Sequence, residues 1–110
     1  MKLGAKQRLF MRLFPRLMDF LHGHDGWECT QGDGYRDPRV FGDSGESKGY
    51  GKAWSLHKLR LAKDINLFID GEWITDSQHP AWTELGEYWE SLHPLCVNGR
   101  HFDDANHFSI

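Results

Sequence analysis

The chain has 110 residues, which suits one domain, and its 39% apolar, 14% aromatic and 26% charged residues are typical of a globular protein. Its net charge of −3 argues against a general affinity for nucleic acid. No run approaches the roughly 18 apolar residues of a membrane span, and no secretory signal follows Met1-Lys2. We therefore expect a single soluble domain over residues 1–110, monomeric and made in the cytoplasm.

Residues 3–21 are predicted to form an amphipathic helix, because apolar side chains recur there at helical spacing. These side chains are Leu3, Phe10, Leu13, Phe14, Leu17 and Leu21. Pro15 predicts a kink or a division into two short helices, since an interior proline removes a backbone hydrogen bond. The opposite face is basic, and we interpret it as solvated, with binding to a membrane or an anionic wall as the alternative. His22 and His24 suit the C-terminal end of this helix.

The glycine-rich stretch from 23 to 53 has no phosphate-binding pattern. Within it, residues 27–30 are predicted to form a short strand. Asp37-Pro38 can open a helical turn, which would place Arg36 just before that turn. Residues 42–51 are expected to form a loop that could flank a cleft.

The second half of the chain contains the clearest strand signal, at residues 65–69, where nearly every position is apolar. Asp70-Gly71 predicts a hairpin turn into a returning strand at 72–75. Residues 81–92 have an aromatic stripe at helical spacing and are predicted to form a core-packed helix that begins near Pro80. A short strand follows at the C-terminus. The predicted fold class is therefore α+β, a small antiparallel sheet with flanking helices.

A candidate metal site combines the middle of the chain with its last residues. Asp64 opens an apolar strand, where a carboxylate is costly unless it is paired, and His57 is its nearest candidate partner. One ion can bind both only if the chain turns back at 58–60. His107 begins the last strand, and Asp104 precedes it by three residues. Two histidines and two carboxylates suit a hydrolytic zinc site. A buried His57–Asp64 ion pair without metal is the alternative.

Three segments carry a resemblance to a known family. They are the SxHxxxxAxD pattern from Ser55 to Asp64 with its RLAxDxNLFxDG continuation, LGxYWESLHPLC from Leu85 to Cys96, and DxNHF from Asp104 to Phe108. Together they resemble the M15 family of zinc peptidases, most closely its small phage-encoded members. The sequence departs from that pattern at Arg60, where the broader family has Gly. It also departs at 97–99, where Val-Asn-Gly stands for the Trp-Gly-Gly of many members.

The resemblance implies a Hedgehog/DD-peptidase-like fold and one zinc ion per chain, bound by His57, Asp64 and His107. It implies that Asp104 is the catalytic acid and base. Arg36 would bind substrate and stabilise the charge that develops on the scissile carbonyl, and Ser55 would lie near the substrate.

The activity that this resemblance implies is cleavage of the peptide stem of bacterial peptidoglycan. The segment likeness favours an L-alanyl-D-glutamate endolysin that acts in phage or prophage lysis and reaches the cell wall after release from the host cytoplasm. A D-Ala-D-Ala carboxypeptidase or dipeptidase is the alternative within the family. A non-catalytic cell-wall-binding virion module on the same scaffold and a purely structural zinc protein are alternatives outside it.

Overall fold

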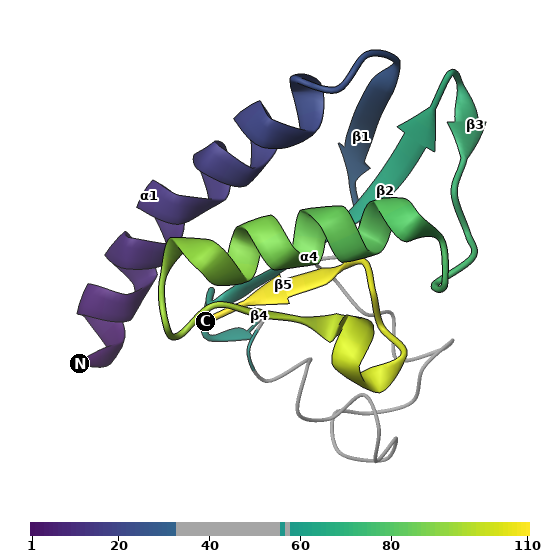
Figure 1. The fold of residues 1–110 in the computed structure, drawn as a ribbon. Helices are drawn as coiled ribbons and strands as arrows, with labels where there is room; N and C mark the ends of the chain where they lie inside the picture. The colour runs from purple at the N-terminus through teal and green to yellow at the C-terminus, as the bar shows by residue number, and fades with distance from the viewer. Residues whose placement is uncertain (33–55, 57) are drawn as a thin grey trace.

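The structure of the chain, a computed structural model, describes residues 1–32, 56 and 58–110 (Figure 1). Within these residues two long helices and a five-stranded antiparallel sheet form an α+β domain, as predicted. The elements are α1 (Leu3–His22), β1 (Trp27–Gln31), β2 (Ala62–Ile69), β3 (Glu72–Trp73), α4 (Pro80–Leu92), β4 (Val97–Asn98), the 3-10 helix η1 (Gly99–Phe102) and β5 (His107–Ser109). The predicted turn at Asp37-Pro38 and the loop at 42–51 lie outside the described residues.

Strand β2 is the centre of the sheet, whose strand order is β1-β2-β5-β4. The second half of β2 pairs with β1, and β3 returns beside its last two residues. The first half of β2 pairs with β5, in a register that sets Asp64 opposite His107. The hairpin turn lies at Asp70-Gly71 as predicted, with positive φ at both residues, but β3 is shorter than the expected 72–75.

The core lies between the sheet and the two helices, which cover the same face of it (Figure 1). Because side chains alternate along a strand, Ile65 and Leu67 of β2 enter this core while Asp64 points to the other face. Trp89 is fully buried at the centre, and its indole N–H donates to the Ser109 carbonyl at 3.1 Å. The aromatic stripe of α4 is therefore core, as predicted.

Helix α1 is one uninterrupted helix of 20 residues, so the expected division at Pro15 is wrong. Pro15 lies on the exposed side, where water can bind the Met11 carbonyl that loses its helical donor. Leu13, Leu17 and Leu21 are buried, whereas Leu3 is 45% exposed and does not belong to the core stripe. No helix among the described residues has the length and apolar character to cross a membrane.

The C-terminal end of α1 is tied to α4 through His24. Its Nδ1 lies 2.8 Å from the Phe20 carbonyl and its Nε2 lies 2.7 Å from the Glu84 carboxylate. Both partners are acceptors, so the doubly protonated ring satisfies both. The hydrogen bond to Glu84 raises the pKa of His24 above its ordinary value, although partial burial opposes this.

A raised histidine pKa makes the stability of the fold depend on pH. The stabilisation by His24 is fully present below about pH 6.5, its unfolded pKa, and is lost as the pH rises through the higher folded pKa. The difference in unfolding free energy between the native chain and His24→Gln should therefore be largest near pH 5.5 and shrink by pH 9, from a maximum below about 1 kcal/mol because Glu84 is half exposed. Urea unfolding across this range measures it, and a constant difference would contradict the assignment.

Candidate metal centre

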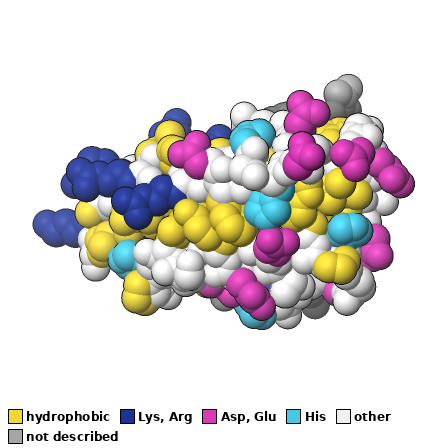
Figure 2. All heavy atoms as spheres, turned by 45° about the horizontal axis from the view of Figure 1, so that its top comes forward, with side chains coloured by type: hydrophobic (Ala, Val, Ile, Leu, Met, Phe, Trp, Pro, Cys, Tyr) yellow, Lys and Arg dark blue, Asp and Glu magenta, His cyan; other side chains and the backbone are white. Residues whose placement is uncertain are grey.

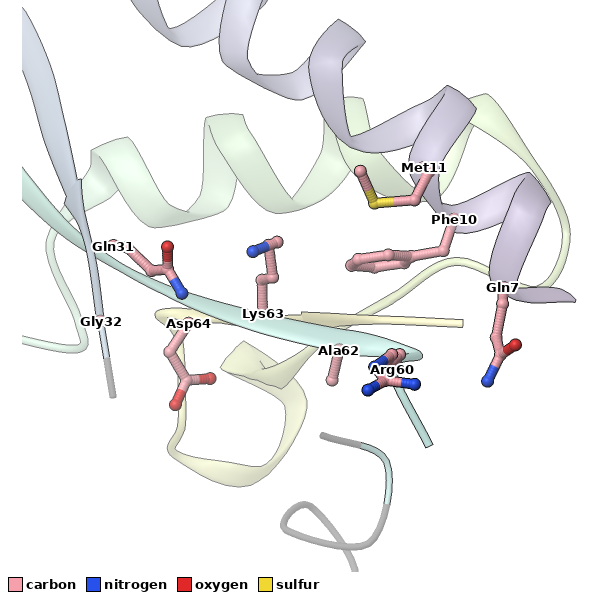
Figure 3. Close-up of a pocket in the computed structure, with 9 residues that line it drawn as sticks. All are labelled: Gln7, Phe10, Met11, Gln31, Gly32, Arg60, Ala62, Lys63 and Asp64. Carbon is pink, nitrogen blue, oxygen red and sulfur yellow. The ribbon is translucent and has the colours of Figure 1, made fainter. Parts of the chain in front are cut away.

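Asp64 and His107 form the centre of the candidate site. They are partners in the pairing of β2 with β5, and Nδ1 of His107 lies 3.2 Å from Oδ1 of Asp64. Figure 3 shows Asp64 and Lys63 on opposite sides of β2, with Lys63 directed toward α1. Both members of the pair are buried, Asp64 being 5% and His107 1% exposed. A carboxylate in such a place needs charged or hydrogen-bonding partners.

Asp104 is the third member of the group. One ligand atom each from Asp64, Asp104 and His107 lies within 4.8 Å of the others. The turn that places Asp104 depends on Gly99. The backbone carbonyl of Gly99 accepts a hydrogen bond from the Asp104 N–H at 2.8 Å. The Asp104 carbonyl occupies the space that a Cβ at position 99 would need, so this close approach requires glycine. That carbonyl also accepts from the His107 N–H at 3.0 Å.

These three side chains could together hold a metal ion. Two carboxylates and one imidazole are the oxygen and nitrogen donors that divalent metals take in proteins, and their separation lets one ion contact all three after small side-chain movements. A cation would also neutralise the buried carboxylate of Asp64. The residues that are described therefore fit a metal centre by donor type, spacing and burial.

The sequence prediction named six site residues, of which the structure describes three. Asp64, Asp104 and His107 come together as predicted, although Asp64 is the third residue of its strand and not the first. The other three, Arg36, Ser55 and His57, lie outside the described residues.

The chain makes the turn that was expected before β2. Residues 59 and 60 form it, with a positive φ of 58° at Arg60. The Leu61 N–H donates to the Leu56 carbonyl at 2.9 Å, so Leu56 lies next to the residue that precedes β2. A turn therefore exists at 59–60, within the predicted 58–60, and the position of His57 lies outside the described residues.

Asn98 is a structural residue of the site that the sequence did not reveal. It is fully buried, and its Nδ2 donates to the carbonyls of Ala105 and His107 at 2.9 and 3.0 Å. Its Oδ1 accepts from the Arg100 backbone N–H at 3.2 Å. One side chain thus joins β4, η1 and the segment between Asp104 and His107, and the only sequence signal was a departure from the family pattern at 97–99.

Glu90 of α4 holds β4 and η1 in place through hydrogen bonds. Its carboxylate accepts from the Asn98 N–H at 2.9 Å, from Arg100 at 2.7 Å and from His101 at 2.8 Å. Burial alone would raise the pKa of Glu90, but these hydrogen bonds outweigh it and lower that pKa. His101 therefore pairs with Glu90 and stands outside the group of three candidate ligands.

Removing the Asn98 side chain should destabilise the fold and loosen the site. Asn98→Ala leaves two buried carbonyls without their donor, so we expect a loss of about 2–4 kcal/mol in unfolding free energy. The neighbouring Val97→Ala, at a partly exposed position of the same strand, should cost less than about 1 kcal/mol. Urea unfolding of both variants measures the contrast. Equal losses would show that Asn98 does not hold the turn.

Two cavities lie beside the candidate ligands. A cavity of about 360 Å³ is lined by Asp104 together with Trp73, Trp82 and residues of the 103–106 turn. A second, of about 340 Å³, reaches from Asp64 and Gly32 past Lys63 to α1 (Figure 3). The indole of Trp73 is largely exposed and lines the cavity beside Asp104. This cavity therefore has an apolar surface next to the Asp104 carboxylate.

Comparisons of this chain with protein-family models, with curated proteins and with solved structures found no match.

Proposed function

We propose that this chain is a zinc peptidase that cuts the peptide stem of bacterial peptidoglycan, as an L-alanyl-D-glutamate endolysin of a phage or prophage. The observation that supports the proposal most is the convergence of Asp64, Asp104 and His107, which are separated by up to 43 residues in the sequence, on one buried point. The peptidase resemblance assigns the same three positions to the catalytic centre.

In this proposal His57, Asp64 and His107 hold the zinc ion, and Asp104 keeps its carboxylate for proton transfer. When bound, zinc acts as a Lewis acid and lowers the pKa of a water molecule toward neutrality. The Asp104 carboxylate accepts the proton that the attacking water releases and donates it to the amine that leaves. Arg36 stabilises the negative charge on the scissile carbonyl oxygen. The Asp64 carboxylate, held beside His107, fixes the orientation of the imidazole.

The cavity beside Asp104 is the proposed place for the stem peptide. Its wall contains Trp73, which is 57% exposed and offers apolar contact, while Asn66 and Asn106 offer amide groups to a peptide backbone. About half of the lining residues are polar, so the cavity combines apolar contact with hydrogen-bonding groups, as a short peptide requires. The carboxylate that moves the proton would then stand at the edge of the cavity that holds the substrate.

Mass spectrometry of the fragments released from purified peptidoglycan tests the proposal. With zinc present, the chain should release stem peptides that begin with D-glutamate, with a new amine for each bond cut. Release of D-alanine alone would assign the D-Ala-D-Ala activity. If the zinc-loaded chain sediments with cell walls and releases nothing, it is a binding module and the peptidase proposal is wrong.

A further inference from the structure

The exposed face of α1 carries a row of arginines. Arg8, Arg12 and Arg16 follow one another at four-residue spacing, so they lie above one another on one side of the helix, and all three are exposed. Figure 2 shows dark-blue basic side chains gathered at one end of the molecule, with magenta acidic side chains over the middle and the other end. Lys2 and Lys6 belong to the same end, and no acidic residue precedes Asp19.

This arrangement costs helix stability. Like charges at four-residue spacing repel. Lys2 and Lys6, at the first turn, also oppose the helix macrodipole. The first turn of α1 has no acidic residue and its N-cap, Lys2, makes no capping hydrogen bond. None of the three arginines forms a salt bridge with another described residue. An arrangement that weakens the fold, with no compensating ion pair among residues 1–32, 56 and 58–110, favours a partner outside the chain.

We propose that this face of α1, defined by Arg8, Arg12, Arg16 and the exposed Met11, docks on an anionic phospholipid bilayer. Met11 is 61% exposed and follows Arg8 by three residues, so it borders the row of arginines on one side. Arginines beside an exposed apolar side chain suit the interface of a bilayer, where phosphates and acyl chains lie close together. The proposal is independent of the peptidase activity.

The mode of docking depends on which side chains of α1 are left on the surface. Its apolar stripe packs in the protein core, so the helix cannot lay that stripe into the bilayer. Binding therefore rests on charge, with only shallow insertion of Met11. Outside residues 2–16 the chain carries eight basic and all 16 acidic residues, a net charge of −8, so an anionic surface attracts the N-terminal part of α1 and repels the remainder. This polarity orients the molecule on the membrane.

Co-sedimentation with vesicles tests the proposal on the full chain. The chain should bind vesicles of equal parts phosphatidylglycerol and phosphatidylcholine, and should not bind phosphatidylcholine alone. At about 1 kcal/mol for each basic residue near the surface, the triple variant R8Q/R12Q/R16Q should bind about 100-fold more weakly. Because the repulsion is relieved, the same variant should melt about 2 °C higher than the native chain.

Two matched variants separate the outcomes. R8K/R12K/R16K keeps the charges and should keep the binding, and M11Q should weaken binding to vesicles several-fold without altering the melting temperature. High salt should release the native chain, since ions screen exposed charges. Binding that survives the triple Gln substitution or high salt overturns the proposal. The proposal is also overturned if single-stranded DNA binds as tightly as the vesicles and M11Q has no effect on vesicle binding. That result would identify a general polyanion site.

Discussion

Replacing Asp104 with asparagine is expected to lower the turnover of purified peptidoglycan by about 10²–10⁴-fold, because an amide cannot accept the proton of the attacking water. The backbone of Asp104 should keep its hydrogen bonds to Gly99 and His107, since the side chain does not take part in them. Zinc content should therefore remain at one ion per chain. Turnover is measured by the release of new amino groups, and zinc by elemental analysis of the same sample.

Asp103→Asn is the matched control for this variant. Asp103 is the neighbouring, exposed carboxylate of the same turn and has a positive φ of 58°, which asparagine tolerates. The substitution removes the same charge from the same turn. Asp103 lines the cavity proposed for the stem peptide, but an exposed charge contributes less than about 1 kcal/mol, so turnover should fall less than about fivefold. Equal losses in both variants would show that turn structure or net charge matters, and not proton transfer. Loss of zinc in Asp104→Asn alone would make Asp104 a ligand.

Removing the metal with a chelator should abolish turnover and lower the melting temperature by at least about 10 °C. At a zinc concentration of about 1,000 times its dissociation constant, binding stabilises the folded chain by about 4 kcal/mol. Without the ion, the nearly buried carboxylate of Asp64 loses a cation that neutralises it. Added zinc should restore both properties. Calorimetric melting of the chelated and reloaded chain measures the stability, and the fragment assay measures the turnover.

Two histidine variants, His107→Ala and His101→Ala, test which histidine binds the metal. His107→Ala should prevent zinc binding at micromolar concentrations, because it removes a nitrogen donor from the group of three. His101→Ala, six residues away, should leave zinc binding intact, because His101 is exposed and pairs with Glu90. If chelation unfolds the chain and no hydrolysis existed beforehand, the metal is structural. If melting is unchanged by chelation, no metal belongs to this site.

Local patterns predicted the elements well, because each depends on nearby residues. The periodicity of 81–92 and Pro80 gave α4 almost to the residue, and Asp70-Gly71 gave the hairpin. Pro15 misled the prediction of α1, since the cost of a proline depends on whether its face is exposed, which the sequence does not state. Strand β4 and helix η1 were missed because both are very short and are held by contacts with distant segments.

The candidate site could be predicted only in part. Spacing alone did not bring Asp64 to His107, because their approach depends on the register of β2 against β5. The peptidase resemblance supplied that pairing. The role of Asn98 could not be predicted, since it follows from tertiary contacts with the carbonyls of Ala105 and His107. An asparagine of this kind is indistinguishable in sequence from one in an exposed turn.

A crystal structure of the chain grown with zinc, with anomalous data collected at the zinc absorption edge, tests the central claim most directly. We predict one strong anomalous peak about 2.0–2.2 Å from a carboxylate oxygen of Asp64 and from imidazole nitrogens of His57 and His107. The account is contradicted if those two imidazoles lie more than about 10 Å apart, too far for any one ion to bind both, and no anomalous peak stands near either.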